Sequence, residues 1–362
     1  MSKTSARRGM CRLFLAAIVA VAVISPSSGL RADDIALVPG AKIKQAIGGR
    51  VRGTIKSETP TEVVLTLGAN TVTVPTDQIT SIRYDLQSAS YQLAESRESA
   101  GQLAEAADLY KKAAADTSGR PFPHQAALFR EAKVLAELAM LDPGQANAAN
   151  DKLNQFIKTY PGGRHIAAAR EALAWLQIQS NNFTGAEATI ATLARMPKGG
   201  ERSAVLRGRL LAKQGKHDEA IAEMDRIIAA SPKGSDRQRA ARLAKAESLA
   251  AVKRFSEAET LLREVIRENP AEDAESQAPA YNTLGDCLRA ANRPKDALIA
   301  YLHTDLLYSK DRQEHPRALA AISMVFRQLK QDGRADEFAQ RLKQEYPNRT
   351  WTRNPNSAAS EK

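Results

Sequence analysis

Cysteine and aromatic residues are scarce in this chain of 362 residues. Cys11 and Cys287 are the only cysteines, and aromatic residues make up 5% of the sequence. A fold held by several disulfides is therefore excluded. The few aromatics, with abundant alanine, suit closely packed helices better than a large sandwich or barrel core. The longest unbroken apolar run, Leu13 to Ile24, is shorter than the roughly 20 residues needed to span a bilayer.

The residue patterns of catalytic and metal sites are also lacking. The five histidines do not combine with one another, with cysteine or with carboxylates at metal-ligand spacing. Neither His-Glu-x-x-His nor Gly-x-Ser-x-Gly occurs. Asp286 precedes Cys287, but neighbouring helical residues point about 100° apart, so this carboxylate does not orient a base for the thiol. We predict no enzyme, no metal and no cofactor. We expect Cys287 to be inert in the core, and the turn residues His165 and His217 to be exposed.

Residues 1–32 have the features of an export signal. Cations precede the apolar run, and small residues with Pro26 follow it, so cleavage is predicted after Gly29 or Ala32. The alternative is an uncleaved membrane anchor. Cleavage would remove five cations and lower the net charge from +11 to +6, and would leave one cysteine and no transmembrane span. We expect a periplasmic or secreted protein, for which nucleic acid is not a partner.

Residues 33–85 predict a small β module. Apolar residues alternate with polar ones around Val51 to Ile55, Val63 to Leu67 and Val72 to Val74, and turn residues separate these runs. Four or five short strands bury one apolar face only by curling, which favours a small SH3-like or Sm-like barrel. The segment between Gly40 and Gly49 lacks the lysine and hydroxyl residue of a phosphate loop, so it is predicted to be a hairpin connection.

From residue 86 to 347 the pattern becomes helical and repeats. An alanine recurs at intervals of 34 to 43 residues, each time with an apolar residue four positions on. These alanines are Ala106, Ala149, Ala186, Ala220, Ala258, Ala297 and Ala335. Four of them have a proline twelve positions on, namely Pro161, Pro232, Pro270 and Pro347. In the clearest unit, helices over 202–213 and 220–228 flank a turn at Gly215. A period in the thirties predicts an α-solenoid.

These positions resemble the tetratricopeptide repeat. The best unit has Gly208, Gly215, Ala220 and Pro232 at the family's offsets. Leu284-Gly285, Ala297 and Tyr301 match a second unit, and Leu93-Ala94, Gly101, Ala106 and Tyr110 match a third. The resemblance covers residues 90 to 347 and implies about seven helix pairs. It implies a mainly α fold in which small residues let paired helices approach closely.

The resemblance also implies a partner-binding surface on the concave face, which the first helices of the repeats line. By register, the groove positions are Trp175, Arg202, Arg209, Glu247, Asn282, Asp286, Arg289 and Arg327. Two interpretations of its arginines are open: they bind acidic partner segments through bidentate contacts, or they are only a solvated helix face. The lysines and asparagines of the family's carboxylate clamp are not all present, so binding of chaperone tails is not supported.

The resulting hypothesis is a non-enzymatic scaffold of the bacterial cell envelope that binds other envelope proteins or peptide segments. One alternative is a cationic binder of anionic cell-envelope polymer that uses Arg202 and Arg209. Another is that the β module is the functional end and the helices oligomerise it. The oligomeric state stays open. Residues 348–362 are predicted to be a disordered tail, in which Trp351 is a candidate cap for the last repeat.

Overall fold

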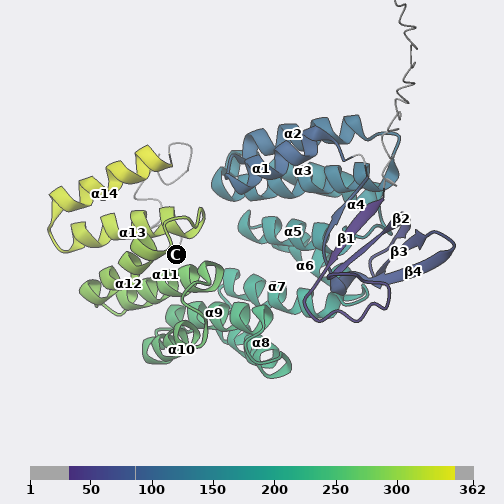
Figure 1. The fold of residues 1–362 in the computed structure, drawn as a ribbon. Helices are drawn as coiled ribbons and strands as arrows, with labels where there is room; N and C mark the ends of the chain where they lie inside the picture. Colours follow the sequence, from purple (N-terminus) through teal and green to yellow (C-terminus); the bar gives the residue numbers. More distant parts are fainter. Residues whose placement is uncertain (1–31, 86, 347–362) are drawn as a thin grey trace, which may run out of the picture.

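The computed structural model describes residues 32–85 and 87–346. The predicted tail lies outside these residues, as does the predicted signal apart from Ala32. The described chain contains five strands and fourteen α-helices (Figure 1). These are β1 (Asp33–Leu37), β2 (Arg50–Glu58), β3 (Glu62–Leu67), β4 (Asn70–Pro75), β5 (Ile79–Arg83), α1 (Ala89–Ser99), α2 (Leu103–Asp116), α3 (Pro121–Leu141), α4 (Ala146–Thr159), α5 (Ile166–Gln179), α6 (Phe183–Ala194), α7 (Gly199–Lys213), α8 (His217–Ala230), α9 (Asp236–Ala251), α10 (Phe255–Glu268), α11 (Ala274–Ala290), α12 (Pro294–Leu307), α13 (Glu314–Gln328) and α14 (Asp332–Glu345).

The strands form one antiparallel sheet in the order β4-β3-β2-β1-β5. Strand β2 alternates as predicted, with Val51 and Ile55 buried and Arg52 exposed. Gly53 is required in this strand, because a Cβ there would lie 2.5 Å from the Thr66 carbonyl oxygen of β3. The small N-terminal β module is confirmed as a five-stranded sheet.

The predicted alanine frame is confirmed. The fourteen described helices pair in sequence, and each of the seven recurrent alanines lies on the second helix of a pair with no exposed surface. The first helices from α3 to α13 contact one another in series, so they form a continuous layer. Pro161, Pro232 and Pro270 each lie two residues beyond the end of a second helix, whereas Pro347 lies outside the described residues.

In every pair except α3–α4, the turn between the two helices contains a residue with left-handed backbone conformation. Gly215 has φ +80°, as its place in the sequence predicts, and Gly101 has φ +70°. In other pairs the same backbone conformation is adopted by Lys253, Asn292 and Lys330, with φ between 59° and 64°. Asparagine tolerates this region better than lysine does. The repeat therefore imposes its turn geometry even where glycine is missing.

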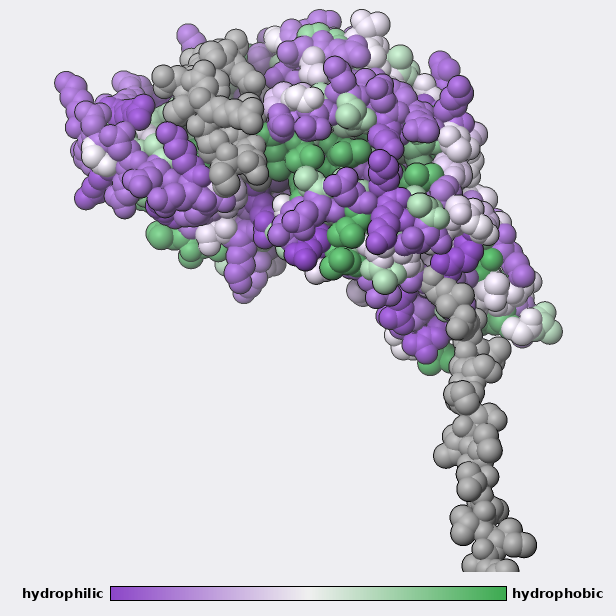
Figure 2. Space-filling view, turned by 90° about the horizontal axis from the view of Figure 1, so that it is seen from above, coloured by the Kyte–Doolittle hydropathy of each residue, from purple (hydrophilic) through white to green (hydrophobic). Residues whose placement is uncertain are grey.

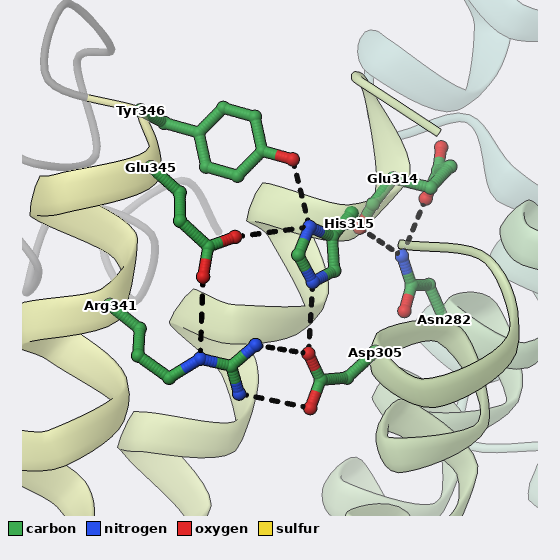
Figure 3. A network of polar contacts seen from close by, with 7 residues as sticks. All are labelled: Asn282, Asp305, Glu314, His315, Arg341, Glu345 and Tyr346. Atoms are coloured by element: carbon green, nitrogen blue, oxygen red, sulfur yellow. Dashed lines mark hydrogen bonds and ion pairs between the residues drawn. The ribbon is translucent and has the colours of Figure 1, made fainter. Parts of the chain in front are cut away.

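A buried polar network fixes the last helix to the array (Figure 3). His315 of α13 lies between Asp305 of α12, at 2.9 Å, and the Tyr346 hydroxyl, at 2.8 Å. Arg341 of α14 donates to both oxygens of Asp305, at 2.9 and 3.2 Å. Burial opposes ionisation of Asp305, but the hydrogen bonds from His315 and Arg341 outweigh it, so the pKa of Asp305 is lowered. The network ties α12, α13 and α14 together.

A second buried network fixes the β module to the array. Glu58 of β2 accepts a hydrogen bond from the Tyr84 hydroxyl at 2.8 Å and one from Arg164 Nε, in the α4–α5 loop, at 3.2 Å. The Glu58 side chain is 1% exposed. Phe122 and Ala126 of α3 add apolar contacts to the core of the sheet. The module is therefore packed against the repeats.

The array curves until its two ends meet. In Figure 1, α13 returns to the neighbourhood of α1 and α3. The side chain of Arg312, in the α12–α13 loop, lies directly over Gly101 in the α1–α2 turn. The concave face is thus enclosed on several sides, and the groove described next lies on it.

Candidate partner-binding groove

A cavity with a volume of about 560 Å³ lies on the concave face. Apolar side chains of α3, α5 and α7 make up most of its wall: Phe129, Ala136, Met140, Ala168, Ala172, Trp175, Val205 and Leu206. Gln313, from the far end of the array, completes it. Figure 2 shows a hollow with a hydrophobic interior between hydrophilic rims. We call this cavity the apolar pocket.

A smaller cavity of about 230 Å³ adjoins the apolar pocket, because Trp175 and Arg209 line both. Its remaining wall comes from α5, α7, α8 and α9 and is more polar: Ile178, Gln179, Ala212, Lys213, His217, Ala244, Glu247 and Ser248. We call it the polar pocket. The two together form the candidate groove.

The boundary between the pockets is a cation–π contact. The Arg209 guanidinium lies 4.6 Å from the centre of the Trp175 ring. Within residues 32–85 and 87–346, Arg209 has no carboxylate partner, whereas Arg202 is paired with Glu171 at 2.6 Å. Arg209 and Lys213 are therefore the groove cations without an ion-pair partner in the described residues, whereas Arg202 forms an exposed ion pair with Glu171.

The structure brings four of the eight predicted groove residues together. Trp175, Arg202 and Arg209 line the apolar pocket, and Glu247 joins Trp175 and Arg209 in the polar pocket. Their grouping is what the repeat register predicts, because successive first helices present equivalent positions to the same face. Whether these residues bind a partner stays a prediction.

The other four predicted residues lie farther along the array, in α11 and α13. Asn282 is fully buried and donates to the Glu314 carbonyl at 2.9 Å and to its carboxylate at 2.7 Å. Asp286 accepts hydrogen bonds from Tyr301 and Arg317.

Arg327, by contrast, is exposed and pairs with Asp336, and Arg289 is half-buried. Asn282 and Asp286 hold helices together, so their side chains are less available to a partner than those at the pockets.

Sequence-family comparison now identifies the array. Three family models described as tetratricopeptide repeats match residues 126–163, 171–235 and 211–278. The helical array is a tetratricopeptide-repeat domain. No curated protein sequence matches the chain.

Solved structures that resemble the chain also contain tetratricopeptide repeats. A tetratricopeptide repeat protein from Parabacteroides merdae shares 15% identity with a TM-score of 0.48, and the match covers 71% of this chain and 93% of that one. PilW, a type IV pilus biogenesis factor, shares 16% identity with a TM-score of 0.43, covering 62% and 96%. A Rap protein complexed with competence and sporulation factor shares 14% identity with a TM-score of 0.48, covering 72% and 76%. TM-scores this low carry no argument about function.

The two turn histidines of the tetratricopeptide domain are less accessible than predicted. His165 stacks on Phe129 with ring centres 4.3 Å apart, and His217 lines the polar pocket; both are half-buried. Burial first, and then two neighbouring arginines, hold the pKa of His165 well below its ordinary value. The expectation of exposure was wrong, because these turns face neighbouring helices rather than solvent.

Cys287 is buried, as predicted. Its thiol is directed at the Phe255 carbonyl oxygen, 3.6 Å away, and burial raises its pKa to about 11. A thiol of this kind is a poor nucleophile at neutral pH. In the part of the chain that the structure describes, no cluster of three or more potential metal ligands occurs, and no helix is both long and apolar enough to cross a membrane.

Proposed function

We propose that this chain is a non-enzymatic scaffold that binds segments of partner proteins on the concave face of its tetratricopeptide superhelix. The observation that carries the proposal is the apolar pocket, which presents Trp175 and Met140 on a surface enclosed by the curvature of the array. Enclosed apolar surface of this kind suits an anchoring side chain of another protein. The composition of residues 1–32, which resembles an export signal, supports a location in the bacterial cell envelope.

The alternative, a cationic binder of anionic envelope polymer, has less support. A polymer groove needs a row of unpaired cations, and Arg202, one of the two arginines on which it rests, is paired with Glu171. The walls of the apolar pocket are mostly aliphatic and aromatic, which suits a protein side chain better than a polyanion.

Site-specific photocrosslinking tests the proposal. A benzoyl-phenylalanine replacing Val205 would lie in the apolar pocket, whereas one replacing Arg226, whose side chain is 80% exposed on α8, serves as the control. In envelope extract we expect discrete protein adducts from position 205 that are absent at position 226 and are lost on Trp175→Ala. Circular dichroism verifies that the variants are folded.

The same experiment has two outcomes that contradict the proposal. If position 205 yields no protein adducts beyond those of position 226, the groove is not a protein-binding site. If the adducts are polymer and disappear steeply as salt concentration rises, the cationic alternative is correct.

A further inference from the structure

The two pockets of the groove differ in chemistry. Apolar atoms predominate in both walls, but polar side chains make up a larger share of the polar pocket, which presents Arg209, Lys213, His217 and Ser248, with Glu247. Because both share Trp175 and Arg209, one bound segment can occupy both at once. A segment that fills the apolar pocket must therefore also present a group that fits the polar pocket.

Three buried polar atoms of the polar pocket have no hydrogen-bond partner in the described chain: Arg209 Nε, His217 Nδ1 and Ser248 Oγ. Ser248 is only 1% exposed. An unpaired buried polar group costs about 1–3 kcal/mol, so folded proteins rarely leave one without a purpose. Three such atoms around one cavity indicate a place where polar groups of a ligand bind.

The charges around the polar pocket favour an anion. Neither Arg209 nor Lys213 forms an ion pair with any residue of the described segments, and the carboxylate that shares this cavity with them is Glu247. Helix α8 begins at His217 in the cavity wall, but Asp218 and Glu219 in its first turn offset the positive end of this helix, so the attraction for an anion comes from Arg209 and Lys213. Glu247 contributes one negative charge to the same cavity, which disfavours a doubly charged group such as phosphate more than a single carboxylate.

We infer that the polar pocket binds an aspartate or glutamate side chain of a partner segment whose neighbouring apolar side chain fills the apolar pocket. The Arg209 Nε–H and the Ser248 hydroxyl donate to the carboxylate, while Trp175 holds the guanidinium in place from below. The motif recognised is thus one large apolar residue and one acidic residue a few positions apart. This inference rests on the proposed function and specifies the partner's chemistry.

Synthetic peptides test the inference directly. A series with capped ends carries one leucine and one glutamate, separated by zero to three residues, in a serine–glycine background. Matched peptides replace the glutamate by glutamine or the leucine by serine, and another has a free terminal carboxylate in place of the glutamate. Binding is followed by Trp175 fluorescence in a Trp351→Phe background, because these are the only two tryptophans.

We expect the best leucine–glutamate peptide to bind roughly tenfold more tightly than its glutamine counterpart, as a charge-assisted hydrogen bond predicts. Arg209→Gln should abolish this preference, and Ser248→Ala should reduce it. Arg226→Gln, which alters an exposed arginine of α8, should leave it unchanged. The serine-for-leucine peptide should bind weakly to every variant.

The inference is overturned if glutamate and glutamine peptides bind equally, if Arg209→Gln retains the preference, or if no peptide changes Trp175 fluorescence at millimolar concentration. A preference for the free terminal carboxylate alone would also overturn it. Crosslinked proteins from position 205 can still be found in each of these cases. Failure of the inference is therefore distinguishable from failure of the proposed scaffold function.

Discussion

Replacing Arg164 by methionine should detach the β module from the repeats. Arg164 and Tyr84 are the two groups that bind the Glu58 carboxylate, and the side chains of Glu58 and Arg164 are 1% and 18% exposed. Methionine retains most of the aliphatic stem of Arg164 but not its charge. The Glu58 carboxylate would then remain buried with the Tyr84 hydroxyl as its neighbouring donor.

The magnitude follows from the burial of this pair. Removing one member of a buried ion pair costs about 3–5 kcal/mol, because the other charge is left without compensation. A cost of about 3 kcal/mol corresponds to a roughly hundredfold increase in the opening of the module. The double variant Glu58→Gln/Arg164→Met should cost less than Arg164→Met alone, because no buried charge remains.

Hydrogen–deuterium exchange measures this effect locally. We expect amides of β2 and β3 to lose protection in Arg164→Met, while those of α9 and α10 keep theirs. Lys198→Met is the matched control, since it breaks another ion pair between module and array, the one with Asp77. The Lys198 and Asp77 side chains are 60% and 55% exposed. An exposed pair contributes at most about 1 kcal/mol. Equal effects of Arg164→Met and Lys198→Met, or strict additivity in the double variant, would refute the reasoning.

Three further predictions concern the repeats. Because the pKa of His165 is depressed, the unfolded chain takes up a proton on acidification that the folded chain does not. The stability from this group is therefore fully present above about pH 6.5 and declines below it. In urea titrations at decreasing pH, His165→Gln should flatten the decline of the unfolding midpoint. Gly285→Ala should lower the free energy of unfolding, measured by urea titration, by about 1–3 kcal/mol, because the added Cβ would press on the buried Tyr301 ring. At Gly208 an added Cβ meets only a flexible methionine, so Gly208→Ala should be neutral or stabilising. Arg341→Met should destabilise α14 by about 3 kcal/mol, because it leaves the buried Asp305 carboxylate partly unpaired. Hydrogen–deuterium exchange should then show amide exchange that becomes faster in α14 than in α7.

The repeat architecture could be predicted because it depends on the spacing of small and apolar residues along the chain. Each recurrent alanine lies where a helix must approach its partner closely, and no larger side chain fits without moving a helix. Strands β2 to β4 were predictable for a similar reason, since period-two alternation marks a half-buried strand. Strand β1 gave no such signal, because its apolar residues Ile35, Ala36 and Leu37 follow one another with no polar residue between them.

The groove could be predicted only in part. Trp175 and Arg209 come together because equivalent positions of neighbouring repeats share a face, and the register of the sequence contains that information. Gln313 reaches the same pocket only because small rotations between repeats accumulate until the array closes. Those rotations depend on packing details that spacing does not encode.

His217 and Ser248 were missed for a different reason. Their involvement depends on which buried polar atoms remain unpaired after folding, and only the folded structure shows that. The nearest sequence signal was the place of His217 at the end of an inter-helix turn, which predicted exposure and thus pointed away from the site.

Rigid attachment of the β module also limits how a partner can engage the chain. Because Glu58 and Arg164 tie the module to the repeats, we expect its surface and the groove to keep one relative orientation. A partner that contacts both surfaces gains from the high effective concentration of the second contact once the first is made. A partner that uses the groove alone gains nothing from this arrangement. Arg164→Met therefore separates the two cases: the affinity of a groove peptide should be unchanged, whereas a full-length partner that also contacts the module should bind more weakly. Equal losses for peptide and full-length partner would show that the ion pair supports the groove itself.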